Sequence, residues 1–185
     1  MTDKCIIVLV GPSGSGKTSI GDVLTAEHGV PKLVTTTTRE PRMGEVDGVD
    51  YYFREFSELD SDAFVEQTIY NNNRYGLTKE EVDSRLEKYQ VVHVSLDQSG
   101  AEAVKAAYPE ETCIVFVSIT EEEMVRRMKK RGDTADEIQS RLDYCRRTNE
   151  LTPLSITDLE IINVDIEESA QKIMGFVSRD SKLNN

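Results

Sequence analysis

The chain has 185 residues and a formal net charge of −12, with 34 acidic against 22 basic side chains. This excess of negative charge argues against nucleic acid or an anionic membrane as a partner. No apolar run approaches the roughly 20 residues of a membrane span, and nothing reads as a targeting segment. The three cysteines form no CxxC pair, so we expect reduced thiols in a cytoplasmic protein.

The first predicted element is a buried strand over residues 5–10, and a helix is expected from 19 to 27. Between them stands Gly11-Pro12-Ser13-Gly14-Ser15-Gly16-Lys17-Thr18, the G-x-x-x-x-G-K-[ST] pattern of a phosphate-binding loop. In such a loop the backbone N–H groups and the helix N-terminus together favour an anion. Lys17 can reach the β- and γ-phosphates of a nucleoside triphosphate, and the Thr18 hydroxyl can bind Mg²⁺. The alternative, a glycine-rich turn that binds nothing, is disfavoured by the strand and helix that flank the motif.

The next part of the chain is dense in charge, glycine and tyrosine, which predicts short strands and tight turns. After a β-branched run at 33–38 we expect a short helix over 57–66, a polar strand over 68–75 and an amphipathic helix over 79–88. The apolar core pattern resumes only after this last helix. Residues 34–90 are therefore predicted to form an inserted lobe.

Arginines and tyrosines in that lobe have the composition of a second phosphate site, because guanidinium groups grip phosphate through two hydrogen bonds. The relevant side chains are Arg39, Arg42, Tyr51 and Tyr75. A solvated charged loop would have the same composition, so both interpretations stay open on composition alone.

The remaining elements alternate between short apolar strands and helices. Strands are expected at 91–96, 113–118 and 159–163, and helices at 99–107 and 166–177. Thr120 with Glu123 and Thr134 with Glu137 have the spacing of capping boxes, and Gly132 separates the two helices that they open. This order predicts an α/β fold with a mostly parallel sheet flanked by helices.

Residues 35–53 resemble the signature of the guanylate kinase family, with T-T-R, a second arginine, G-E and G-x-D-Y-x-F in order. The similarity continues over nearly the whole chain, through Phe64-Val65-Glu66, Tyr75-Gly76, Arg131-Gly132, Ser140-Arg141-Leu142 and Asn163-Val164-Asp165. The resemblance implies transfer of a phosphoryl group from ATP to GMP or dGMP with Mg²⁺. It also implies a P-loop core (1–33 and 91–185), the inserted monophosphate-binding lobe (34–90) and a lid at about 126–145.

The resemblance assigns roles position by position. The residues that would bind ATP are Gly11, Ser13, Gly14, Ser15, Gly16, Lys17, Thr18 and Ser19, with Arg127 beside the base. The residues that would bind GMP are Thr35, Arg39, Arg42, Glu45, Tyr51, Glu66, Tyr75 and Asp97. Glu66 would read guanine, since its two oxygens can accept from N1–H and from the exocyclic amine. Lys17, Arg131 and Arg141 would be catalytic, and Mg²⁺ would bind Thr18 and, through water, Asp97.

Three departures from the family pattern concern the base pocket and the lid. Ser95 stands in place of an acidic residue, Leu77 in place of a hydroxyl expected near the base, and the loop after Gly132 is about one residue shorter. A related phosphotransferase with another acceptor, such as ribose 1,5-bisphosphate or a different nucleotide, is therefore an alternative. A non-catalytic interaction module is another, although the intact phosphate loop and lid arginines disfavour it. A GTPase is disfavoured because no guanine-reading motif of that class follows the phosphate loop.

Overall fold

The computed structural model describes residues 4–55, 60–70 and 72–183. Its central sheet consists of four parallel strands in the order β6-β1-β7-β8. These are β1 (Cys5–Val10), β6 (Val91–Ser95), β7 (Thr112–Ser118) and β8 (Leu159–Ile162). All four lie within one residue of the predicted bounds, and the expected α/β fold with a parallel sheet is confirmed.

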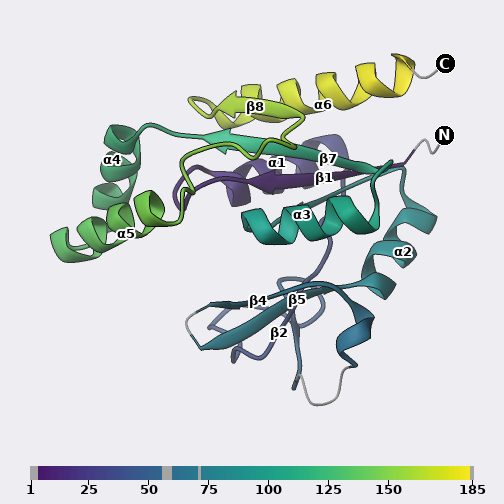
Figure 1. Ribbon diagram of the computed structural model, residues 1–185, viewed down its shortest axis with the longest axis horizontal. Helices are drawn as coiled ribbons and strands as arrows, with labels where there is room; N and C mark the ends of the chain where they lie inside the picture. Colours follow the sequence, from purple (N-terminus) through teal and green to yellow (C-terminus); the bar gives the residue numbers. More distant parts are fainter. Residues whose placement is uncertain (1–3, 56–59, 71, 184–185) are drawn as a thin grey trace.

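Helices cover both faces of this sheet because alternate side chains of each central strand point to opposite sides. Ile7 and Leu9 of β1 pack towards α1 (Lys17–His28) and α6 (Ile166–Leu183). Their neighbours Ile6, Val8 and Val10 pack towards α3 (Gln98–Ala107). In Figure 1, α6 and α3 accordingly lie on opposite sides of β1 and β7.

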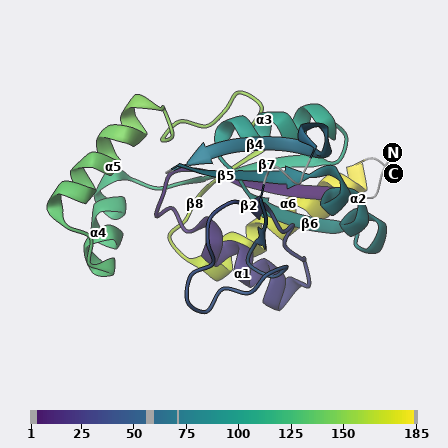
Figure 2. The same ribbon diagram turned by 90° about the horizontal axis from the view of Figure 1, so that it is seen from below.

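A second four-stranded sheet, in the order β3-β2-β5-β4, lies beside the α3 face of the core (Figure 1). Figure 2 shows the molecule from the side on which this second sheet lies. Its strands are β2 (Thr36–Thr37), β3 (Tyr52–Phe53), β4 (Phe64–Tyr70) and β5 (Asn73–Thr78). Helix α2 (Lys79–Lys88), predicted at 79–88, then returns the chain to β6.

Two sequence predictions in this region are wrong. The helix expected over 57–66 is only a 3-10 turn at Ser61–Ala63, and residues 64–66 already belong to β4, while 56–59 lie outside the described residues. The single strand expected over 68–75 is instead a hairpin of β4 and β5. Both errors have one cause, because pairing of β4 with β5 overrides the local preference of each segment.

The second sheet shares an apolar cluster with the core rather than forming its own. Leu77 of β5 is fully buried in that cluster with Ile6 and Val8 of β1, and Val82 and Leu86 of α2 join them. The lobe proposed for 34–90 is thus packed directly onto the central sheet.

Helices α4 (Glu121–Arg131) and α5 (Ala135–Arg147) project from one end of the core (Figure 1). Gly132 ends α4 in the left-handed conformation, with φ 96°, and Thr134 forms the predicted capping box with Glu137. At the start of α4 only half of the expected box forms, because the carboxylate of Glu123 pairs with arginines of its own helix. Among the described residues, no helix has the length and apolar character that a membrane span requires.

Candidate active site

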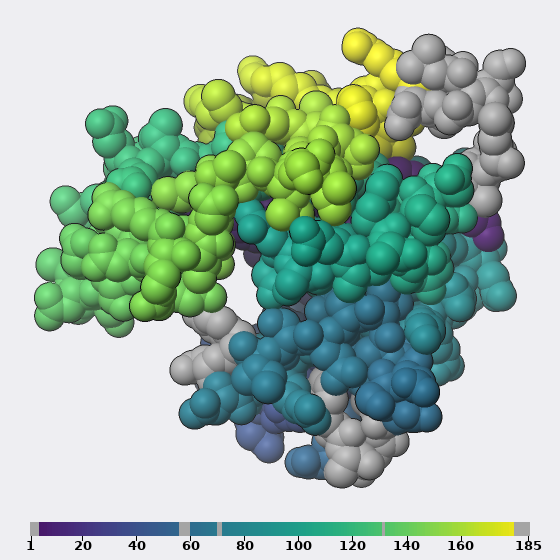
Figure 3. Space-filling model, in the orientation of Figure 1, coloured from purple at the N-terminus to yellow at the C-terminus, as the bar shows by residue number. Residues whose placement is uncertain are grey.

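A cavity of about 470 Å³ lies where the phosphate loop, the second sheet and α5 meet. The space-filling view is hollowed between α5 and the second sheet (Figure 3). Its walls carry side chains from all three parts of the chain, including Lys17, Thr35, Arg39, Arg42, Glu45, Tyr51, Glu66, Tyr75, Asp97 and Arg141. Lys17 and Arg141, which are 124 positions apart in the sequence, therefore share one space.

The conformation of the phosphate loop requires glycine at two positions. Gly11 has φ 144°, and a Cβ there would lie 2.3 Å from the carbonyl oxygen of Val117. Gly16 has φ 97°, and a Cβ there would lie 2.2 Å from Nδ2 of Asn163. Lys17 folds back over the loop and donates to the carbonyl oxygens of Gly11 at 2.6 Å and Pro12 at 3.0 Å. Burial lowers the pKa of Lys17 to about 8, and the negative charge of Glu150 partly opposes this shift.

Two side chains hold the loop from outside. The Arg127 guanidinium donates to the carbonyl oxygens of Gly14 and Ser15, both at 3.3 Å, and to that of Asn163 at 2.7 Å. Asn163 is buried and donates from Nδ2 to the Ser15 carbonyl at 2.6 Å. The structure thus places Arg127 against the phosphate loop, while Thr18 and Ser19 are exposed at the start of α1.

The arginines and tyrosines predicted to hold a second phosphate form one cluster. Arg39 pairs with Glu45 at 2.8 Å, and this interaction lowers the pKa of Glu45. The Arg39 guanidinium lies 5.4 Å from the ring centre of Tyr51, which meets Tyr75 edge-on at 5.9 Å. Glu45 also accepts from the backbone N–H of Arg42 at 2.7 Å, so one carboxylate organises both arginine positions.

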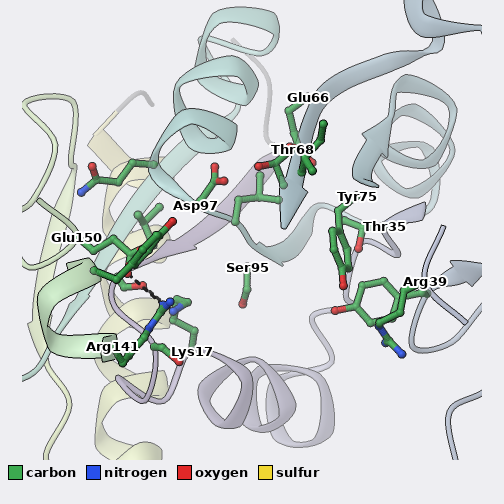
Figure 4. A pocket seen from close by; sticks show the side chains of 18 of the residues that line it. Lys17, Thr35, Arg39, Glu66, Thr68, Tyr75, Ser95, Asp97, Arg141 and Glu150 are labelled. Carbon is green, nitrogen blue, oxygen red and sulfur yellow. Dashed lines mark hydrogen bonds and ion pairs between the residues drawn. The ribbon is translucent and has the colours of Figure 1, made fainter. Parts of the chain in front are cut away.

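Two acidic side chains, Glu66 and Asp97, line the cavity (Figure 4). Glu66, on β4, is only 7% exposed, and burial, followed by the negative charge of Asp97, raises its pKa to about 7. The backbone N–H of Leu77 opposes the shift by donating to the Glu66 carboxylate. Asp97 caps α3, accepting from the N–H of Gly100 at 2.7 Å. A Cβ on Gly100 would lie 3.3 Å from Oε2 of Glu66, so glycine there lets α3 approach the carboxylate closely.

Leu77 does not line the cavity, and the expectation that its side chain faces the base is wrong. Its side chain is fully buried from solvent and belongs to the apolar cluster of the core. Its contribution to the site comes from its backbone. Thr35 does line the cavity and is buried, and Ser95, in the position where an acidic residue was expected, lines it with an exposed side chain.

The two arginines of the proposed lid lie on neighbouring helices. Arg141 of α5 lines the cavity on the side of Lys17 and pairs with Glu150 at 3.2 Å (Figure 4). Arg131 is the last residue of α4, and its side chain lies outside the described part of the chain.

Comparison with known proteins identifies the family of the chain. The family model described as "Guanylate kinase" matches residues 3–180. The chain belongs to the guanylate kinase family. A guanylate kinase of Fusobacterium nucleatum is 33% identical, with 98% of this chain and 100% of that protein covered. One from Caldanaerobacter subterraneus is 35% identical, with coverage of 93% and 85%.

Solved structures give the same family and extend the fold beyond it. The crystal structure of guanylate kinase from Anaplasma phagocytophilum has a TM-score of 0.67 and 26% identity, covering 96% of this chain and 86% of that one. A shikimate kinase from Acinetobacter baumannii, at 18% identity and a TM-score of 0.52, shares the fold alone.

Sequence reasoning missed several residues that line the cavity of this guanylate kinase family member, among them Thr68, Tyr144 and Glu150. Thr68 lies on β4 two residues after Glu66, and the alternation of a strand would have indicated it. Tyr144 lies three residues after Arg141, which places it on the same face of α5. Glu150 follows the end of α5, and no pattern in the sequence indicates that it turns into the site.

Proposed function

We propose that the protein transfers the γ-phosphoryl group of ATP to GMP or dGMP, giving ADP and GDP or dGDP. One observation carries the proposal: a single cavity has the phosphate loop on one side and the Arg39 cluster, with Glu66, on the other. Phosphoryl transfer needs two substrates held in line and the charge of the moving group neutralised. Two anion sites that face a common space suit that requirement.

On the donor side, the loop from Gly11 to Gly16 would hold the phosphates of ATP, with Thr18 and Ser19 at the helix N-terminus behind them. Lys17 already points its ammonium group to the inside of the loop, where a phosphate oxygen could replace the carbonyl oxygens of Gly11 and Pro12. Arg127 supports the loop and is proposed to border the adenine site. Its hydrogen bonds to the carbonyl oxygens of Gly14 and Ser15, in the phosphate loop, support this proposal.

On the acceptor side, Arg39, Arg42, Tyr51 and Tyr75 would bind the phosphate of GMP, and Glu45 would keep the arginines in place. Glu66, Asp97 and Thr35 would surround the base. An ionised Glu66 accepts from N1–H and the amino group of guanine, and adenine lacks that pair of donors. The buried position of Glu66 makes this discrimination strong, because a donor left unpaired there costs about 1–3 kcal/mol.

During transfer, Lys17 and Arg141 would stabilise the negative charge of the moving phosphoryl group, and Arg131 is proposed to join them. These groups come from the core and from the segment 126–145, which we propose to close as a lid over both nucleotides. Closure would exclude water, so that phosphate passes to GMP rather than to solvent.

Mg²⁺ fits this arrangement as a partner of the ATP phosphates. The ion is usually held by one or two protein oxygens together with phosphates and waters, and Thr18 and Asp97 offer such hard oxygen donors. Among the described residues, no group of three His, Cys, Asp or Glu side chains forms a metal site on its own. Bound Mg²⁺ would supply charge neutralisation between the β- and γ-phosphates.

The test is an ADP-release assay with ATP, Mg²⁺ and a panel of acceptors: GMP, dGMP, AMP, CMP, UMP and ribose 1,5-bisphosphate. GMP and dGMP should be turned over and the other compounds should be poor acceptors. Preference for AMP or for the ribose phosphate would reject the proposed acceptor. Absence of turnover with every acceptor, in a protein that still binds ATP, would favour an interaction module.

A further inference from the structure

Among the described residues that line the cavity, Glu150 is the one acidic side chain that the proposed mechanism does not use. Its Oε2 atom lies 3.2 Å from Nη2 of Arg141, and the thiol of Cys145 donates to the same oxygen at 3.3 Å. Both charged side chains are about one-fifth exposed, at 21% each, and both line the cavity. Figure 4 shows the pair next to Lys17.

The backbone explains how a residue beyond α5 reaches back to that helix. Asn149 adopts φ 57° just after the end of α5, which reverses the chain. The N–H of Glu150 then donates to the carbonyl oxygen of Cys145 at 3.0 Å, so the side chain of Glu150 lies along the last turns of α5. These main-chain contacts hold Glu150 beside the helix independently of its ion pair.

The same turn is attached to the core. Gln98, the first residue of α3, donates from Nε2 to the carbonyl oxygen of Thr152 at 2.9 Å and to that of Asn149 at 3.4 Å. Glu150 therefore belongs to a segment tied to the core, whereas Arg141 belongs to the projecting helix α5. The ion pair spans the boundary between the core and the proposed lid.

The remaining contacts of Arg141 leave it able to bind phosphate. Its guanidinium carbon lies 5.0 Å from the ring centre of Tyr144, so Glu150 and Tyr144 together restrict the guanidinium. Glu150 accepts a hydrogen bond from Nη2 of Arg141, while Nε of Arg141 is buried and has no hydrogen-bond partner among the described residues. An arginine so restricted loses less conformational entropy when a phosphoryl group arrives.

We propose that Glu150 is a positioning residue, which holds the Arg141 guanidinium towards the phosphate loop for phosphoryl transfer. The inference rests on the proposed function, because it assigns Arg141 to the transferring group. A part-exposed ion pair contributes little to folding stability, so the placement of Glu150 inside the cavity is better explained by catalysis than by stability.

The test compares Glu150→Gln with Glu121→Gln. Glu121 pairs with Arg146 between α4 and α5 but lies outside the cavity, which makes it a matched control. Glu150→Gln should lower kcat about tenfold, the loss expected for one charge-assisted hydrogen bond, and leave the KM for GMP nearly unchanged. Glu121→Gln should leave both constants at the wild-type value.

Rescue by a conservative variant supplies a readout that a structural role would not move. Glu150→Asp keeps the negative charge and should recover part of the kcat lost in Glu150→Gln, with the KM for GMP nearly unchanged. Wild-type kcat in Glu150→Gln, or an equal loss in Glu121→Gln, would overturn the inference while leaving GMP turnover by the wild-type protein intact. Absence of GMP turnover by the wild type would instead reject the proposed function, and with it this role of Glu150.

Discussion

The pKa of Glu66 leads to a specific prediction about how GMP binding depends on pH. Only the ionised carboxylate can accept from both N1–H and the amino group of guanine, since a protonated carboxyl places an O–H on one oxygen. With a pKa of about 7 in the free protein, Glu66 is about 90% ionised at pH 8 and about 9% ionised at pH 6. Because the apparent affinity scales with the competent fraction, the KM for GMP should rise about tenfold between pH 8 and pH 6.

The assay is ADP release at saturating ATP, with GMP varied at each pH from 6 to 8. The phosphate of GMP also titrates near pH 6, so the wild-type profile alone is ambiguous. Glu66→Gln removes the carboxylate titration and keeps that of the phosphate. The variant should bind GMP more weakly at pH 8 and show a smaller rise in KM towards pH 6. An identical pH dependence of KM in the two proteins would refute the reasoning.

Four further predictions follow from particular contacts. Lys17→Ala should lower kcat at least about 100-fold with an unchanged circular dichroism spectrum, because its ammonium group bonds only loop carbonyls within the described structure; near-normal kcat would exclude Lys17 from catalysis. Arg42→Ala should raise the KM for GMP about 10- to 100-fold and leave that for ATP unchanged in the same assay, as expected for a lost guanidinium–phosphate contact; an equal effect on both substrates would contradict the assignment. Leu77→Ser should lower the free energy of unfolding in urea by about 2–5 kcal/mol, because this fully buried side chain belongs to the core cluster; wild-type stability would contradict that packing. Burial lowers the pKa of His93 to about 4, so this side chain stays neutral in the folded protein but binds a proton below about pH 6.5 in the unfolded chain. The free energy of unfolding should therefore fall by about 3 kcal/mol between pH 6.5 and pH 4 because of His93. The measurement is the difference in this free energy between wild type and His93→Gln at each pH, and a difference independent of pH would contradict the prediction.

The local patterns in the sequence predicted the parts of the fold that are determined locally. The strand before the phosphate loop, the glycines that the loop needs and the helix after it lie within 25 residues of one another. Thr134 and Glu137 likewise form the predicted capping box because both partners belong to the same turn. In each case the residues that make the contact are also neighbours in the sequence.

The errors occur where distant pairing decides the structure. Phe64 and Glu66 become strand residues by pairing with Thr78 and Leu77, which lie on the other strand of a hairpin. That pairing also directs Leu77 into the core and leaves only its N–H for Glu66. The residue types and their order in the sequence predicted many of the side chains that line the cavity. They did not predict the orientation of Leu77 or the chain reversal that places Glu150.

The apolar clusters formed by the described residues indicate which parts of the molecule should unfold together. The second sheet shares buried side chains such as Leu77 with the central sheet, so its unfolding should be cooperative with that of the core. Helices α4 and α5 instead pack around a separate cluster that contains Met124 and Leu142. Their amide hydrogens should therefore exchange through a sub-global opening of lower free energy, one that leaves the central strands protected.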